Sequence, residues 1–150
     1  MEEGIIAFVV TKACQLQCKY CYLVGKNQEG KMSFDVAQKA IDYILNERKF
    51  LSTPSVTFDF IGGEPLLEIK LLEDITSYII ASMQKLSHPW KDNFHLKITT
   101  NGLLYRDKRV QRYISRYKEI LRLSISFDGI KAKHDLNRVF PMGRGHITKC

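Results

Sequence analysis

The chain has 150 residues, of which 45% are hydrophobic, and a formal net charge of +7. This size and composition fit one globular domain with a real core, or a part of something larger. No apolar run approaches the ~20 residues that a membrane-spanning helix needs. The acidic start MEEGIIAFVV also differs from a secretory signal peptide. We therefore expect a protein of the cytoplasm, with no membrane partner, whose reduced cysteines serve metal binding or catalysis.

Four short segments, rich in apolar and β-branched residues and bounded by turn residues, predict β-strands. They are residues 5–10 (IIAFVV), 55–61 (SVTFDFI), 94–100 (FHLKITT) and 121–127 (LRLSISF). The first is a continuous apolar run, which predicts a strand buried on both faces.

Between these strands, apolar residues recur at intervals of three and four, which predicts amphipathic helices. The helices are expected over residues 34–50, about 71–83, and 106–118. Ser33 is the expected N-cap of the first helix. In the third, Val110, Tyr113 and Tyr117 are spaced to face the core.

Alternating strands and helices predict an α/β fold, a parallel sheet of (βα) repeats with right-handed crossovers. About four such strands are present, which is half of an eight-unit barrel. After Gly129 the pattern fades, and we expect a loop with no further element before Cys150. We therefore expect a truncated chain that folds poorly alone and is inactive by itself, because its last strand would leave an open edge.

The unusual residues of the chain follow the strands directly. The stretch CQLQCKYCY comes after the first strand, GGEP after the second and TNG after the third, and SFDG closes the fourth. The carboxyl ends of parallel strands form the ligand-binding edge of α/β folds. We therefore expect these four segments to converge on one site.

Cys14, Cys18 and Cys21 are soft thiolate donors, which select iron–sulfur clusters, zinc or copper(I). A four-iron cubane takes one ligand per iron, commonly four cysteines, so three on one loop would leave one iron open to another ligand. The spacing also differs from the bacterial ferredoxin run, which argues against simple electron transfer. Two alternatives remain open: a zinc site completed by Cys150 or a histidine, and cysteines that bind no metal.

The spacing C-x3-C-x2-C after a first strand, with Tyr20 before the third cysteine, resembles the radical S-adenosylmethionine (radical SAM) enzymes. GGEP is similar to their second hallmark. TNG, SFDG and HDLNR resemble the subgroup that matures sulfatases and ribosomal peptides, often with a C-terminal SPASM-type domain that carries auxiliary clusters. The resemblance runs from about Ile5 to Gly145.

This resemblance implies that residues 1–150 form an incomplete radical SAM core domain. They would be the N-terminal portion of a partial (βα)6 TIM-like barrel, without its C-terminal part and without any auxiliary-cluster domain. The three cysteines would hold a [4Fe–4S] cluster whose open iron chelates S-adenosylmethionine. Reductive cleavage of that cofactor would give a 5′-deoxyadenosyl radical that abstracts hydrogen from a substrate, while the protein orients and shields it.

The resemblance also implies a set of cofactor-binding residues, namely Tyr20, Gly62, Gly63, Glu64, Pro65, Ser126 and Arg138. No catalytic acid or base can be assigned within these 150 residues. In the GGEP segment, glycine would remove the Cβ that blocks close approach of the backbone to a ligand. Glu64 would help to hold the methionyl ammonium group, and the alternative is a tight turn with an incidental acid.

Structural alternatives exist for the other positions as well. Tyr20 could pack within its loop, and Ser126 could bond locally. TNG could be a turn in which Asn101 tolerates a positive φ. Arg138 could pair with a carboxylate of the cofactor or tie its loop to Asp135.

The helix expected over 106–118 is strongly basic, since residues 106–122 carry seven basic and two acidic side chains. It could be a solvated face, or a patch for nucleic acid or an acidic partner. We predict a radical SAM enzyme that modifies a peptide or protein, with a reductant such as flavodoxin or ferredoxin. The alternatives are a radical SAM enzyme acting on RNA or a small molecule, and a metal-stabilised nucleic-acid-binding module. Nucleic acid is the less expected partner.

Overall fold

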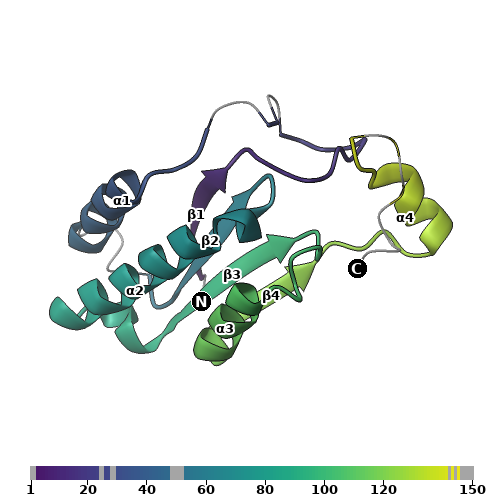
Figure 1. The fold of residues 1–150 in the computed structure, drawn as a ribbon. Helices are drawn as coiled ribbons and strands as arrows, with labels where there is room; N and C mark the ends of the chain where they lie inside the picture. Colours follow the sequence, from purple (N-terminus) through teal and green to yellow (C-terminus); the bar gives the residue numbers. More distant parts are fainter. Residues whose placement is uncertain are drawn as a thin grey trace.

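The computed structural model describes residues 3–23, 26–27, 30–47, 53–141, 143 and 145. Its four parallel strands form one sheet in chain order: β1 (Gly4–Thr11), β2 (Val56–Gly62), β3 (Phe94–Thr100) and β4 (Leu121–Ile125). Sequential strands that are also spatial neighbours, joined by right-handed crossovers, place their helices on one face of the sheet (Figure 1). This is the arrangement of a barrel wall, and the predicted α/β class with parallel repeats is confirmed.

Helices and two 3₁₀ turns connect the strands: α1 (Phe34–Asn46), η2 (Pro65–Glu68), α2 (Ile69–Lys85), η3 (Pro89–Asp92) and α3 (Lys108–Tyr117). Ser33 caps α1 as predicted, because its side chain accepts a hydrogen bond from Val36 N at 3.3 Å. The helix ends at Asn46, where Glu47 turns to extended backbone; residues 48–50 of the predicted helix lie outside the described residues. None of the helices in the described ranges is long and apolar enough to cross a bilayer.

The core lies between the sheet and the helices on its outer face. Phe58, at 1% exposure, is at its centre, and its ring lies 6.3–6.4 Å from those of Phe8, Trp90 and Phe94. Tilted and edge-to-face rings at such separations are the favoured arrangement of aromatic clusters. The indole N–H of Trp90 donates to the carbonyl of Thr53 at 2.7 Å, which satisfies the one polar atom of this cluster. These contacts lock β2 to the segments before and after it.

The basic helix α3 packs as its periodicity predicts. Val110, Tyr113 and Tyr117 are buried, and the Tyr113 hydroxyl lies 2.8 Å from that of Thr76 on α2. Burial raises the pKa of Tyr113 far above its ordinary value. Because Val110, Tyr113 and Tyr117 face the core, the basic side chains of this helix lie on its solvent face.

The inner face of the sheet carries no covering layer among the described residues. On β1, Ile5 and Val9 are 68% and 47% exposed, while Phe8 and Val10 are buried. The prediction of a strand buried on both faces is therefore wrong for this chain. Among the described residues, helices cover the outer face of β1 and nothing covers its inner face. An apolar run in the sequence does not distinguish these two cases.

The segment after Gly129 is not the featureless loop that the sequence predicts, because it contains α4 (Lys131–Asn137). This helix lies beyond the carboxyl ends of β3 and β4, apart from the three outer helices (Figure 1). Lys131 and Asp135 form an ion pair one helical turn apart, and the buried His134 packs its ring 4.9 Å from Phe127. A helix of seven residues with one buried position has too little periodicity to be recognised in the sequence.

We expect Phe58→Ala to lower the free energy of unfolding by about 3–5 kcal/mol, because it empties the centre of the aromatic cluster. Chemical denaturation followed by circular dichroism measures this change. Leu86→Ala, at an exposed position after α2, is the control and should stay within about 0.5 kcal/mol of the parent. Equal effects of the two substitutions would contradict the placement of the core.

Candidate functional site

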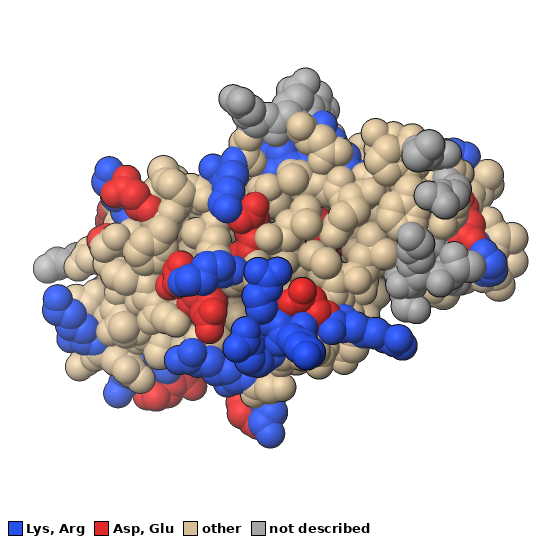
Figure 2. Space-filling model, viewed as in Figure 1, with Lys and Arg blue, Asp and Glu red and all other residues tan. Residues whose placement is uncertain are grey.

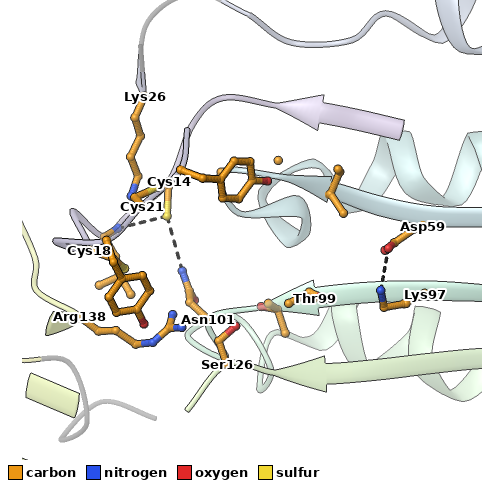
Figure 3. A pocket seen from close by; sticks show the side chains of 17 residues that line it. Cys14, Cys18, Cys21, Lys26, Asp59, Lys97, Thr99, Asn101, Ser126 and Arg138 are labelled. Carbon is orange, nitrogen blue, oxygen red and sulfur yellow. Dashed lines mark hydrogen bonds and ion pairs between the residues drawn. The ribbon is translucent and has the colours of Figure 1, made fainter. Parts of the chain in front are cut away.

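A pocket of about 330 Å³ opens at the carboxyl ends of the strands, where the four motifs meet (Figure 3). Its walls come from the cysteine loop, from β2 and β3 with the turns that follow them, and from the segments after β4. The lining residues are Cys14, Leu16, Cys18, Tyr20, Cys21, Tyr22, Lys26, Asp59, Ile61, Gly62, Gly63, Lys97, Thr99, Thr100, Asn101, Ser126 and Arg138. The predicted convergence of four segments on one edge is therefore found.

The three cysteines occupy one end of this pocket as free, half-buried thiols. Their loop is held by the fully buried Leu16 and by Asn27, whose side-chain oxygen accepts a hydrogen bond from Cys14 N at 2.8 Å. Burial raises the pKa of the Cys18 thiol. Lys26 Nζ lies 3.7 Å from Cys21 Sγ, so a positive charge stands beside this cysteine.

The donor set fits an iron–sulfur cluster, because thiolates are the ligands that such clusters take. Among the described residues, no three His, Cys, Asp or Glu side chains form a group that could hold a single metal ion. A cubane differs from a single ion, since each iron takes a thiolate of its own. The three thiols therefore do not have to converge on one point.

The GGEP turn packs directly on the start of the cysteine loop. Gly63 N donates to Thr11 O and Glu64 N donates to Ala13 O, each at 2.8 Å. A Cβ on Gly63 would lie closer than 3.0 Å to the backbone of Ala13, and one on Gly62, whose φ is +149°, would overlap Thr11 O. These glycines therefore allow close approach of two segments of the chain itself, and their binding of a cofactor stays a prediction.

Glu64 is 1% exposed and points away from the pocket into the protein. One carboxylate oxygen accepts hydrogen bonds from Leu66 N and Thr100 Oγ1, and the other accepts from Asn101 N at 2.8 Å. Burial raises the pKa of Glu64, and these three hydrogen bonds oppose that shift. Glu64 thus joins the turn after β2 to the turn after β3, and Pro65 lies buried behind it as the first residue of η2.

Asn101 extends this chain of contacts to the cysteines. Its side-chain amide nitrogen lies 3.8 Å from Cys14 Sγ and 3.3 Å from Gln15 Oε1, and its side-chain oxygen accepts from Leu103 N at 3.0 Å. The positive φ of this turn, +84°, falls on Gly102 and not on Asn101. The suggested positive φ at Asn101 is therefore wrong.

Tyr20, Asp128 and Arg138 form a clamp between the cysteine loop and the segments around α4. The Tyr20 hydroxyl donates to Asp128 at 2.7–2.8 Å, and Arg138 Nε donates to the same carboxylate at 2.9 Å. The guanidinium also lies over the Tyr20 ring, 5.4 Å from its centroid. Asp128, rather than Asp135, is therefore the partner of Arg138, because Asp135 pairs with Lys131 within α4.

Two backbone hydrogen bonds reinforce this clamp. Gln17 N donates to Val139 O at 2.7 Å, and Lys19 N donates to Asn137 O at 2.9 Å. Burial and the bond to Asp128 raise the pKa of Tyr20 to about 12, so its hydroxyl stays protonated and donates at neutral pH. Burial alone would raise the pKa of Asp128, but the hydrogen bonds from Arg138 and Tyr20 outweigh it and lower that pKa.

A family model of the radical SAM superfamily matches residues 8–149. The chain belongs to the radical SAM superfamily. The cofactors of this family are a [4Fe–4S] cluster and S-adenosylmethionine, so the prediction of these cofactors is confirmed at the level of the family. The resemblance to its sulfatase-maturase subgroup is confirmed as well.

Three curated relatives of this radical SAM chain are similar over most of its length. It is 33% identical over 136 residues, 90% of this chain and 42% of the relative, to an uncharacterized protein of Methanocaldococcus jannaschii. It is 30% identical to a probable GTP 3′,8-cyclase of Methanococcus maripaludis, over 79% of this chain and 34% of the relative. It is 28% identical to the serine-type anaerobic sulfatase-maturating enzyme of Bacteroides thetaiotaomicron, over 93% of this chain and 33% of that enzyme.

Among solved structures, a histidine-tagged form of anSMEcpe with bound AdoMet (S-adenosylmethionine) superimposes with a TM-score of 0.74 and 25% identity. The superposition covers 98% of this chain and 38% of that one. The radical SAM chain thus spans well under half the length of its curated and solved relatives.

The structure gathers most of the predicted cofactor-binding residues of this radical SAM chain around the pocket. Tyr20, Gly62, Gly63, Ser126 and Arg138 line it together with the three cysteines, whereas Glu64 and Pro65 lie behind its wall. Their contacts with the cofactor stay predictions.

Three charged lining residues were not predicted from the sequence, namely Lys26, Asp59 and Lys97. The pairing of Asp128 with Tyr20 and Arg138 was not predicted either. For Asp59 and Lys97 a signal existed, since each is the one Asp, Glu, Lys or Arg of its predicted strand. For Asp128 no local pattern reveals partners that lie far away in the sequence.

Gly63→Ala should prevent stable assembly of the cluster, because the new methyl group forces the GGEP turn away from the cysteine loop. We expect loss of most iron and sulfide after anaerobic reconstitution, with destabilisation of about 1–3 kcal/mol. Gly4→Ala, at the other end of β1, is the control, because the nearest atom to its added methyl group is the side-chain Cγ2 of Thr53 at 3.0 Å, and backbone comes no closer than 3.5 Å. Full iron content in Gly63→Ala would contradict the close packing described here.

Asp128→Asn should weaken the clamp by about 2 kcal/mol, because hydrogen bonds to a charged acceptor are lost. Hydrogen exchange at the amides of Gln17 and Lys19 should then be more than tenfold faster at neutral pH. In the parent protein the lowered pKa of Asp128 means that this stabilisation is present above the ordinary aspartate pKa of about 4. It is lost as the pH falls through the lowered value. Unchanged exchange in Asp128→Asn at neutral pH would count against the clamp.

Proposed function

We propose that this chain is the incomplete core domain of a radical SAM enzyme, in which Cys14, Cys18 and Cys21 hold the [4Fe–4S] cluster. The observation that carries this proposal is the meeting of three free thiols with the GGEP turn, Ser126 and Arg138 at one pocket. When bound, the cluster supplies the electron that cleaves S-adenosylmethionine to methionine and a 5′-deoxyadenosyl radical. The thiol chemistry of such a site requires a reducing compartment, for which we propose the cytoplasm.

The residues of the pocket divide the binding of S-adenosylmethionine among them in this proposal. Gly62 and Gly63 line the pocket and present backbone groups to the methionyl group. Arg138 keeps guanidinium donors beyond the one used on Asp128 and can meet the methionyl carboxylate. Ser126 offers a hydroxyl to the ribose or the carboxylate, and Tyr20 offers a ring face and backbone to the adenine.

Glu64 has a different role in this proposal from the one first expected. Its carboxylate is committed to Thr100, Asn101 and Leu66, so it positions the cofactor-binding turns. Any direct contact with the methionyl ammonium would require it to give up a buried hydrogen bond, which costs about 1–3 kcal/mol. We therefore assign the ammonium to backbone carbonyls of the GGEP turn.

The substrate that we propose is a peptide or protein. Support comes from the similarity to a sulfatase-maturating enzyme and from the superposition on anSMEcpe, one structure of which holds the Cp18Cys peptide. A small-molecule substrate is the second candidate, since a probable GTP 3′,8-cyclase is a relative as well. Product analysis with peptides and with nucleotides separates the two.

A nucleic-acid-binding function has weaker support. The groove between α2 and α3 is lined by Lys70, Arg109, Arg112 and Arg116 (Figure 2), but Glu73 lines it too and lies 3.5 Å from Arg116. Among the residues that the structure describes, no aromatic side chain that could stack on a base lines this groove. A positive surface of this kind suits an acidic reductant such as flavodoxin or ferredoxin, which we propose as the partner protein.

Cys18→Ala should abolish the four-iron resonance signal, and with it 5′-deoxyadenosine release, because two cysteines cannot hold a cubane that keeps one iron open. The measurement is electron paramagnetic resonance of the complete, anaerobically reconstituted and dithionite-reduced protein, with and without S-adenosylmethionine. The parent should give a four-iron signal that changes with the cofactor. Cys150→Ala is the control, and it should leave this signal intact. Stoichiometric zinc that is lost in Cys150→Ala would overturn the cluster assignment in favour of a structural zinc site.

A further inference from the structure

An ion pair lies at the end of the pocket away from the cysteines (Figure 3). Asp59 on β2 and Lys97 on β3 are direct neighbours in the sheet register, and Lys97 Nζ lies 2.7 Å from Asp59 Oδ2. Both side chains belong to the inner face of the sheet, opposite the helices. They share one cavity with the three cysteines, which lie at its other end.

The pair is only partly satisfied by the chain itself. Asp59 is 7% exposed, and its second oxygen, Oδ1, is buried and receives no hydrogen bond from any residue that the structure describes. The side chain of Lys97 is 40% exposed, and its ammonium group has two N–H donors beyond the one that meets Asp59. One acceptor and at least one donor are therefore left for something else.

Stability does not account for charges at this position. The interior of a barrel is ordinarily filled by branched apolar side chains. A buried ion pair often contributes nothing over apolar residues of similar volume, and an unsatisfied buried carboxylate oxygen costs free energy. On the other side of Asp59, the register neighbour on β1 is Ala7, whose small side chain leaves space open. The arrangement suits a ligand better than a packed core.

We propose that Asp59 and Lys97 bind the main-chain N–H and C=O of one residue of an extended peptide substrate, a proposal that rests on the peptide substrate proposed above. Lys97 donates to the peptide carbonyl oxygen, and Asp59 accepts from the peptide N–H. A carboxylate oxygen can accept more than one hydrogen bond, so Asp59 Oδ2 can accept from the peptide N–H while it keeps its hydrogen bond from Lys97. The pair is thereby a binding element for the segment next to the hydrogen that the radical abstracts.

Charge balance favours a neutral amide as the occupant. A substrate carboxylate would be attracted by Lys97 but repelled by Asp59 beside it. A substrate ammonium group would be attracted by Asp59 but repelled by Lys97. One residue of an extended peptide offers an N–H and a C=O that point to the same side and carry no net charge, so it satisfies both groups and leaves the ion pair in place. The pair thus selects for a peptide backbone rather than for a charged side chain.

The test uses the complete, reconstituted enzyme and a panel of synthetic peptides that carry serine or cysteine. In Lys97→Met and Asp59→Asn we expect KM for the modified peptide to rise at least tenfold. Release of 5′-deoxyadenosine without peptide should stay within twofold of the parent, because the cysteine end of the pocket is untouched. Lys97→Arg should keep most of the affinity, since it retains a positive donor. Lys39→Met, which breaks an ion pair with Asp35 on the outer face of α1, is the matched control.

An ester in place of the amide at each peptide position in turn removes one N–H and keeps the carbonyl. One such ester should raise KM in the parent enzyme but have little further effect in Asp59→Asn. Peptide turnover with unchanged KM in Lys97→Met would overturn this inference and leave the proposed function standing. Loss of peptide-free 5′-deoxyadenosine release in the variants would also overturn it, since the pair would then serve the cofactor or the fold. A parent that releases 5′-deoxyadenosine but modifies no peptide would refute the peptide substrate, and this inference with it.

Discussion

Two backbone hydrogen bonds, from Gly63 N to Thr11 O and from Glu64 N to Ala13 O, hold the site of this chain together. They bind the turn after β2 to the loop after β1, and they require that no side chain stands between the two. From this contact the other parts follow outward. Glu64, fixed in place, orders the turn after β3 through Asn101, and Asn101 in turn approaches Cys14. The three cysteines, the proposed cluster ligands, are thus connected to the sheet through backbone and buried carboxylate contacts and do not depend on the loop alone.

Much of this arrangement could be predicted from the sequence, because the functional motifs directly follow segments that are recognisable as strands. Alternating apolar runs and amphipathic repeats predict parallel strands, and motifs at the strand ends must then share one edge of the sheet. The three cysteines, the two glycines of GGEP and Arg138 reach the pocket for that reason. Ser33, with its short polar side chain before an apolar repeat, predicts the start of α1 in the same way.

What could not be predicted depends on contacts between distant residues. Arg138 has Asp135 three positions away, but α4 turns that carboxylate toward Lys131 and leaves Arg138 to Asp128. Ile5 and Val9 are exposed because no element that the structure describes packs on the inner face of β1, which their own sequence does not indicate. The pairing of Asp59 with Lys97 depends on the register of β2 against β3. Local pattern carries none of this information, because each outcome is decided by a partner elsewhere in the chain.

The clamp around Asp128 has a consequence for the order of events during synthesis. Tyr20 and Asp128 are 108 residues apart in the sequence, so the cysteines leave the ribosome long before the segment that fastens their loop. Until then the contacts that the structure describes for this loop are those with β1 and the nearby Asn27, and later those with the GGEP turn and Asn101. Its closure is a late, non-local step of the kind that slows folding. If the three cysteines hold a cluster as proposed, its insertion would follow translation of α4, once Gln17 and Lys19 have formed their hydrogen bonds with Val139 and Asn137.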